Sequence, residues 1–296
     1  MPREQDDTWV LVETDPDGRY HRKEDLLGEG SFWCVYKAFD SATGIDVAWN
    51  QVKIMGRLSG NMEQSLVLLQ KVRHESMLEC FHFWEDETRQ HVNVITELAG
   101  SGTLKSFAER QRVDLEIVCK WARQILSALN YLHTNFIIYR DLNCDSIFIN
   151  ENLEEAKLGN IALHALLSEM HAQHHTHSFC TPEFMAPELF EEQYTEKVDV
   201  YAFGMCILAI FTSEAPYSEC ISATQVYKKM AKGLPPSALD KIENIAVKHF
   251  IEQCLAPEVD RPSAKALLQH ELLMEDASVP GPTATGTNLS SGDRGA

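Results

Sequence analysis

The chain has 296 residues, about twice the length of an ordinary domain, which predicts one large two-lobed domain or two ordinary ones. Hydrophobic residues make up 44% and charged residues 24%, values typical of globular proteins that exclude wholesale disorder and fibrous classes. The 26 Lys and Arg residues against 44 Asp and Glu residues give a net charge of −18. Because nucleic acids and anionic lipids are bound by cations that neutralise phosphates, we expect no nucleic-acid partner.

The sequence also argues against membrane insertion. The longest apolar run, Val200–Phe211, is shorter than the roughly 20 residues that a bilayer-spanning helix needs. The first ten residues are acidic and have no apolar core, so we expect no secretory signal. Eight scattered cysteines without a CxxC pair predict a reducing, intracellular setting, and we expect a cytoplasmic location with nuclear access open.

The N-terminal third is predicted to be rich in strands. From about Arg19 to Val52, aromatic and β-branched residues alternate with others between Gly or Asp turns, as strands require. A helix is predicted over Met62–Val72, followed by strands over Leu78–Asp86 and Val92–Glu97. This part is therefore expected to form a small β-rich lobe.

The remainder is predicted to be helical. Apolar residues at helical spacing indicate helices over Leu104–Gln111 and Leu115–Thr134, with further helices to about Met274. Strands followed by helices predict an α+β architecture with a cleft between two lobes. The last twenty residues are rich in Pro, Gly, Ser and Thr, so we expect a disordered tail over 276–296.

Four motifs occur in the order of the protein-kinase signature set. They are GEGSFWCVYKA (Gly28–Ala38), YRDLNCDSIFI (Tyr139–Ile149), KLGNIAL (Lys157–Leu163) and TPEFMAPE (Thr181–Glu188). The chain therefore resembles a eukaryotic protein kinase. The phrase GIDVAWNQVK (Gly44–Lys53) is similar to the With-No-Lysine serine/threonine kinases, in particular their plant members.

The resemblance implies a bilobal kinase fold over 20–275, with a small lobe at 20–99, a large lobe at 100–275 and an N-terminal extension at 1–19. It implies ATP as the nucleotide, with a protein substrate or partner, and places Asp141 as the catalytic base; a purely structural role within its loop stays open. The residues that it places around a nucleotide lie in the glycine-rich loop, two strands and the hinge: Gly28, Gly30, Val35, Ala48, Thr96, Glu97, Leu98 and Ala99.

Five positions depart from the residues that phosphoryl transfer uses, which are a lysine on the phosphates and carboxylates on magnesium. Trp33 stands where the family places its substitute lysine, and Asn50 stands at the lysine position of other kinases. Ser65 replaces the glutamate that pairs with the lysine. Ser146 and Asn160 replace the asparagine and aspartate that hold magnesium, so we expect little hold on Mg²⁺ and no other metal site. ATP binding, if retained, is expected to be weak and to depend on the hinge.

Further residues of the sequence also bear on the site and on the stability of the large lobe. Lys37 shares the strand face of Trp33 but lies further from the phosphate end, so we interpret it as a solvated lysine. Ser178 resembles the family's activating phosphoserine, although an ordinary loop serine stays open. The histidine run His171–His177 is interpreted as a solvated loop. Glu188 and Arg261 are expected to form a buried ion pair, and Asp199 to anchor the catalytic loop.

Three functions stay open on the sequence. The first is a catalytically impaired kinase homologue, a scaffold or allosteric partner in phosphorylation signalling. The second is an active, ATP-dependent Ser/Thr kinase that uses Asp141 as base. The third is a nucleotide-binding switch without phosphotransfer. The site chemistry favours the first, because function is decided by the site rather than by the fold.

Overall fold

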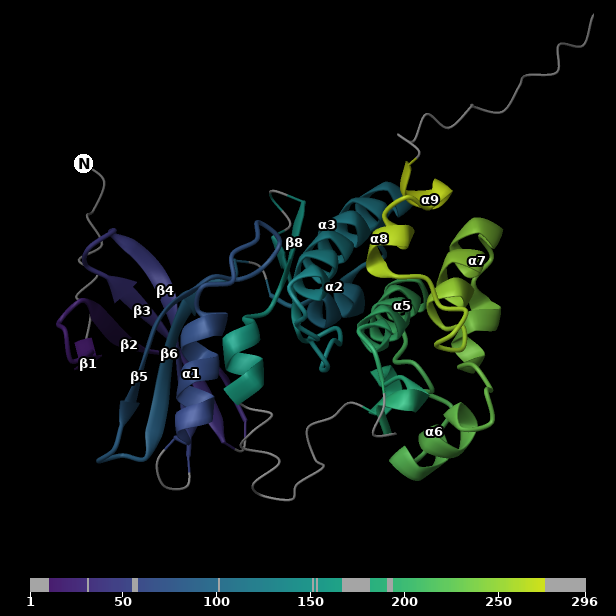
Figure 1. Cartoon of the computed structure of the whole chain (residues 1–296). Coiled ribbons are helices and arrows are strands. Elements are labelled where there is room, and N and C mark those ends of the chain that lie inside the picture. Colours follow the sequence, from purple (N-terminus) through teal and green to yellow (C-terminus); the bar gives the residue numbers. More distant parts are fainter. Residues whose placement is uncertain are drawn as a thin grey trace, which may run out of the picture.

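The computed structural model describes residues 11–30, 32–54, 58–100, 102–150, 152, 154–166, 182–190 and 194–274. It has a strand-rich part and a helix-rich part side by side (Figure 1). This arrangement agrees with the α+β class expected from the sequence. Among the described residues, the structure holds no helix with the length and apolar character that a bilayer crossing requires.

The small lobe is built on a six-stranded antiparallel sheet. Its strands follow one another in the order β1-β2-β3-β4-β6-β5. Their bounds are β1 Leu11–Thr14, β2 Tyr20–Glu29, β3 Trp33–Asp40, β4 Ile45–Lys53, β5 Cys80–Asp86 and β6 His91–Glu97. Strand β1 lies within the extension expected at 1–19 and pairs with β2, so part of that segment belongs to the sheet.

One helix, α1 (Gly60–Leu69), packs on this sheet. Ser59 begins it by accepting a hydrogen bond from the backbone N–H of Met62, which places its start two residues before the predicted one. Met62 and Leu66, one helical turn apart, are buried together with Val52 and other sheet residues. The helix is thereby fixed over the sheet face nearest to the second lobe (Figure 1).

The large lobe is mainly helical. Its helices are α2 Leu104–Arg110, α3 Leu115–Thr134, α5 Lys197–Thr212, α6 Ala223–Met230, α7 Ile245–Cys254, α8 Ala264–Leu267 and α9 Glu271–Met274. A two-stranded sheet, β7 Ile147–Asn150 and β8 Glu155–Leu158, lies toward the small lobe (Figure 1). Short 3₁₀ turns occupy Pro182–Phe184, Pro187–Phe190 and Ser237–Lys241.

Helix α5 forms the centre of the large lobe. Every residue from Val198 to Ile210 is buried, as expected of a helix that is apolar all round. Gly204 allows α7 to approach closely, because a Cβ atom added there would lie 3.3 Å from Leu255 and would overlap the Cβ of Cys254. Helix α3 instead buries one stripe of apolar residues. Its observed bounds, Leu115–Thr134, are the bounds predicted from the sequence.

Residues 161–166 form a further helical segment directly after β8. In Figure 1 it is the short teal helix beside α1. Ala162 and Leu166 are buried in the same cluster as Met62 and Leu66 of α1. This segment therefore ties the large-lobe motif KLGNIAL to the small lobe.

Candidate nucleotide and phosphotransfer site

The glycine-rich segment forms the hairpin between β2 and β3. The N–H of Gly30 donates to the carbonyl of Trp33 at 2.8 Å and closes the turn. The indole of Trp33 folds beneath the hairpin, since a Cβ added to Gly30 would lie 2.7 Å from Trp33 Cε2 and one added to Gly28 would lie 3.5 Å from Cζ3. The ring also packs against the cluster that holds Val52 and Leu66. The indole ring thus lies against both glycines of the hairpin.

The next predicted position, Asn50, lies inside the sheet. It is 4% exposed, and its amide donates to the carbonyl of Val94 at 3.0 Å and to Thr96 Oγ1 at 3.1 Å. Its cross-strand neighbour is Val35, and the neighbouring Ala48 pairs with Lys37 on β3. These contacts give the Asn50 side chain a structural role between β4 and β6.

Lys37 does not point along the hairpin. Its Nζ lies 2.8 Å from Asp46 Oδ2, and this contact raises the pKa of the lysine. The same carboxylate accepts a hydrogen bond from Lys23 at 2.8 Å. Lys37 is therefore a partly exposed lysine that is also ion-paired.

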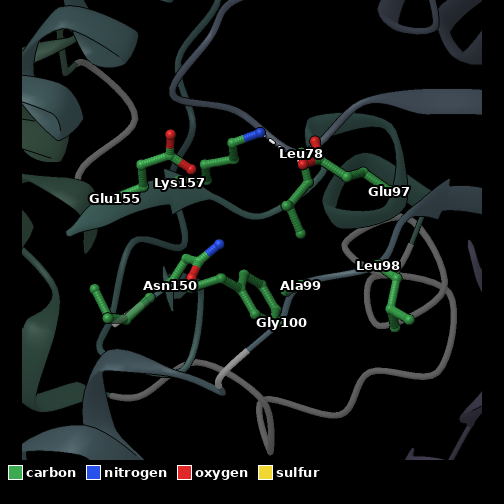
Figure 2. A pocket seen from close by; sticks show the side chains of 10 residues that line it. Leu78, Glu97, Leu98, Ala99, Gly100, Asn150, Glu155 and Lys157 are labelled. Carbon is green, nitrogen blue, oxygen red and sulfur yellow. Dashed lines mark hydrogen bonds and ion pairs between the residues drawn. The ribbon is translucent and has the colours of Figure 1, made fainter. Parts of the chain in front are cut away.

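The predicted hinge, Thr96–Ala99, leaves the end of β6. The carboxylate of Glu97 lies 2.6 Å from Lys157 on β8 and its N–H donates to the carbonyl of Glu79. Figure 2 shows this ion pair above a small cavity of about 50 Å³. The residues that line it are Leu78, Glu97, Leu98, Ala99, Gly100, Phe148, Ile149, Asn150, Glu155 and Lys157. Glu97 thus points to the large lobe and joins the two lobes at the hinge.

The loop that was predicted to be catalytic is anchored by α5. Asp199 is 1% exposed and accepts hydrogen bonds from the N–H groups of Tyr139 and Arg140, both at 2.8 Å, and from His133 Nε2 at 2.9 Å. The predicted anchoring role of Asp199 is confirmed by these contacts. Tyr139 itself is buried, which raises the pKa of its hydroxyl well above the ordinary value. The loop is therefore a rigid platform.

Asp141 lies at the surface of this platform. Its side chain is 36% exposed, Oδ2 lies 3.7 Å from His164 Nδ1, and Oδ1 accepts a long, 3.4 Å hydrogen bond from Asn143. The neighbouring Asp145 turns away, because Lys105 holds its carboxylate at 3.1 Å. The loop thus presents one carboxylate, already faced by an imidazole.

Ser146 is turned into the loop. It is 4% exposed, and its hydroxyl donates to the carbonyl of Asn143 at 2.9 Å while accepting from the Asn143 N–H at 2.9 Å. The side-chain oxygen of Asn143 in turn accepts from the N–H groups of Asp145 and Ser146. Both side chains are consequently used in closing the turn.

Asn160 begins the helical segment 161–166. Its Oδ1 accepts hydrogen bonds from the N–H groups of Ala162 and Leu163 at 3.0 and 3.1 Å, the pattern of a helix N-cap. Its amide donates to the carbonyl of Leu78 at 3.0 Å, and the residue is 5% exposed. Ser65, on α1, is exposed instead. The two positions therefore do not contribute to one shared polar site.

Two residues of this region were missed on the sequence. Asn143 has a recognisable signal, because an asparagine two residues before a loop N–H commonly forms an Asx turn. His164 has a weaker signal: it lies four residues after the cap Asn160, one turn into the helix. The centroid of its ring lies 4.7 Å from the ring centroid of Tyr139, and its Nδ1 lies 3.7 Å from Asp141 Oδ2.

Of the remaining predictions, one concerns residues that the structure describes and the others do not. Arg261 is 1% exposed and pairs with both carboxylate oxygens of Glu188, which confirms the buried ion pair. Ser178, the run His171–His177 and the tail 276–296 lie outside the described residues. Ser146 precedes β7 and its carbonyl accepts a hydrogen bond from the N–H of Gly159, next to Asn160, at 2.7 Å, while Trp33 lies against the glycine hairpin.

The sequence matches a known protein family. The family model described as "Protein kinase domain" matches residues 20–273. The chain belongs to the protein kinase family. The match covers both lobes, and it confirms the fold inferred from the order of the motifs.

Individual relatives show which kinases the chain is similar to. The chain is 44% identical over 274 residues to "Serine/threonine-protein kinase WNK8" of Arabidopsis thaliana, covering 90% of this chain and 48% of that protein. It is 43% identical to "Probable serine/threonine-protein kinase WNK10" of the same plant, covering 90% and 52%. It is 42% identical to "Probable serine/threonine-protein kinase WNK6" of Oryza sativa subsp. japonica, covering 93% and 64%.

These matches confirm the resemblance to With-No-Lysine kinases that the motifs indicate. The chain spans about half the length of the first two relatives.

Proposed function

We propose that this kinase-family protein is catalytically impaired and acts as a scaffold or allosteric partner in a phosphorylation pathway, in the cytoplasm with access to the nucleus. Its partners are proteins, and ATP binds weakly if at all, through the hinge backbone. The alternatives are an active Ser/Thr kinase that uses Asp141 as base, and a switch that binds nucleotide without transferring phosphate.

One observation carries the proposal. The side chains at the positions expected to hold phosphate and metal are engaged with the protein itself: Asn50 and Asn160 are buried and hydrogen-bonded, and the Trp33 indole lies under the glycine hairpin. A triphosphate needs backbone N–H groups and cations at that hairpin. A neutral ring there supplies neither, so the local chemistry disfavours phosphate.

The donor set does not fit magnesium. Mg²⁺ requires hard oxygen ligands in a near-ideal octahedron, usually carboxylates. Ser146 Oγ and Asn160 Oδ1 are neutral and both accept backbone hydrogen bonds already. Of the two carboxylates on this loop, Asp141 faces His164 and Asp145 is paired with Lys105. We therefore assign no step of phosphoryl transfer to a metal ion in this chain.

Thermal melting separates the three functions. The full chain is heated alone, with ATP, and with ATP and Mg²⁺. An unchanged melting temperature supports the scaffold, a rise with ATP alone supports the switch, and a rise of several degrees that requires Mg²⁺ contradicts the proposal.

Phosphotransfer is tested directly with radiolabelled ATP and a generic protein substrate. The matched control is Asp141→Asn, which removes the proposed base while keeping the size of the side chain. We expect equal labelling by both proteins. Labelling by the unmodified chain well above the control would establish an active kinase.

A further inference from the structure

Three metal-ligating side chains meet on the small lobe, away from the cleft. Asp15 and Asp17 lie in the turn between β1 and β2, and His82 lies on β5. One possible ligand atom from each residue lies within 4.8 Å of the other two. His82 Nε2 and Asp17 Oδ2 are 3.9 Å apart.

The juxtaposition depends on the curl of the sheet. β1 and β5 are its opposite edges in hydrogen-bonding order. The right-handed twist of strands curls a sheet of this size, so that residues from β2 and β5 face each other. Tyr20 on β2 stacks on the ring of His82, with ring centroids 6.1 Å apart. The ring of Trp84 also stacks with His82, with ring centroids 5.7 Å apart, so two aromatic rings contact the His82 imidazole.

Asp15 supplies an independent observation. The residue is only 4% exposed. Its Oδ1 accepts hydrogen bonds from the N–H groups of Arg19 and Tyr20 at 2.6 and 2.7 Å, whereas Oδ2 is buried and has no hydrogen-bond partner among the described residues. A buried carboxylate oxygen without a donor is unfavourable, because it has lost its water without replacement.

The guanidinium of Arg19, whose own backbone N–H binds Asp15, does not donate to this oxygen. The Arg19 side chain donates instead to both carboxylate oxygens of Asp40, at 2.8 and 2.6 Å. A cation bound between Asp15, Asp17 and His82 would supply the missing partner.

We propose that Asp15, Asp17 and His82 form a binding site for a transition-metal dication, with Zn²⁺ as the best-fitting ion. Two carboxylates and one imidazole are ligands that zinc accepts, and water completes the tetrahedron. The present spacing is wider than that between ligands of a bound zinc ion. The Asp17 side chain is 78% exposed and closes the site by rotation, while Asp15 and His82 are already held. The ion then joins the β1–β2 turn to β5.

The test measures zinc stoichiometry and affinity by competition with a chromophoric chelator, on the full chain after treatment with EDTA. Because His171–His177 contains further histidines, all variants are made in a background where His171, His174, His175 and His177 are changed to Ala. We expect one equivalent of zinc in that background and a rise in melting temperature on adding it.

Asp17→Asn and His82→Gln are each expected to weaken zinc binding at least about tenfold, as loss of one of three protein ligands requires. Glu24→Gln is the matched control, since it removes an exposed carboxylate of the same sheet without touching the site. Asp17 is exposed, so its variant is expected to melt normally without zinc. Equal affinity in Asp17→Asn and the background protein, or no zinc bound by the background protein, would overturn the proposal. Neither outcome depends on the kinase cleft.

Discussion

At the scale of single residues, side chains of the candidate site make their contacts with other parts of the protein. Trp33 packs beneath the glycine hairpin and against the sheet cluster. Asn143 and Ser146 exchange hydrogen bonds within the loop that presents Asp141. Such contacts stabilise the fold, because each polar group keeps a partner after losing water.

We expect Trp33→Ala to destabilise the protein by about 2 kcal/mol, since a buried aromatic deletion costs about 3–5 kcal/mol and this ring is only partly buried. Denaturation in urea measures the change. Phe136→Ala is the control, because Phe136 is 97% exposed and its loss should have no resolvable effect. A Trp33 variant as stable as the control would show that the ring does not pack as described.

A second residue-scale prediction concerns pH. Burial lowers the pKa of His74 below its ordinary value of 6.5, and its Nδ1 accepts a hydrogen bond from the N–H of Ser76, which requires the neutral ring. The unfolded chain therefore binds more protons than the folded chain below pH 6.5. The contribution of His74 to stability is complete above that pH and declines as the pH falls toward the folded pKa.

His74→Asn retains an acceptor oxygen and cannot titrate. We expect its free energy of unfolding to fall less between pH 7.5 and 5.5 than that of the unmodified protein, with His21→Asn as the matched control. Parallel pH profiles for His74→Asn and the unmodified protein would contradict the assignment.

At the scale of elements, the helical segment 161–166 connects the candidate site to the small lobe. It begins at the cap residue Asn160 and buries Ala162 and Leu166 beside α1. The motif at the end of β8 therefore continues as a helix that contacts the small lobe. Capping and burial act together here, because a segment this short is unstable as an isolated helix.

Substitution of Asn160 tests this description. Asn160→Ala removes the cap and the amide bond to Leu78, and we expect a loss of about 1–3 kcal/mol. Asn160→Ser keeps a capping oxygen and should recover part of that loss. Urea denaturation of the three proteins gives the order. Equal stability of the Ala and Ser variants would show that the cap contributes nothing.

At the scale of the whole molecule, charge burial holds the large lobe together. Arg261 pairs with Glu188 and also donates to the carbonyls of Ala256 and Lys197, so it joins the stretch 188–197 to the stretch 256–261. The pair between Lys120 and Glu154, at 2.7 Å, is instead exposed, since its side chains are 42% and 51% exposed.

We expect Arg261→Met to destabilise the protein by about 3–5 kcal/mol, because it leaves Glu188 buried without a partner. Lys120→Met should change the free energy of unfolding by less than about 1 kcal/mol. Both are measured in urea at pH 7. A small effect of Arg261→Met would mean that water reaches Glu188.

A whole-molecule prediction follows from the proposed function. The quadruple variant Trp33→Lys, Ser65→Glu, Ser146→Asn and Asn160→Asp restores the residues implied by the family resemblance. We expect it to gain a melting-temperature rise with ATP that requires Mg²⁺, whereas the same protein carrying Trp33→Gln in place of Trp33→Lys should gain less. If the quadruple variant folds and shows no such rise, these four positions are not what limits nucleotide binding.

Local patterns in the sequence determined much of the architecture. The apolar spacing of Leu115–Thr134 predicted α3 at both ends, and the motif order predicted the kinase fold. Residues close in sequence interact through helical or strand periodicity, which is legible without a structure. The sequence alone also showed that Trp33, Asn50 and Asn160 differ from the residues used in phosphoryl transfer.

The tertiary structure alone decided where those side chains go. It placed Asn160 at a helix start, His164 against Asp141, and Asp15 beside His82 across the curled sheet. Each of these contacts joins parts that only chain packing and sheet twist bring together, and sequence periodicity carries no information about such distances.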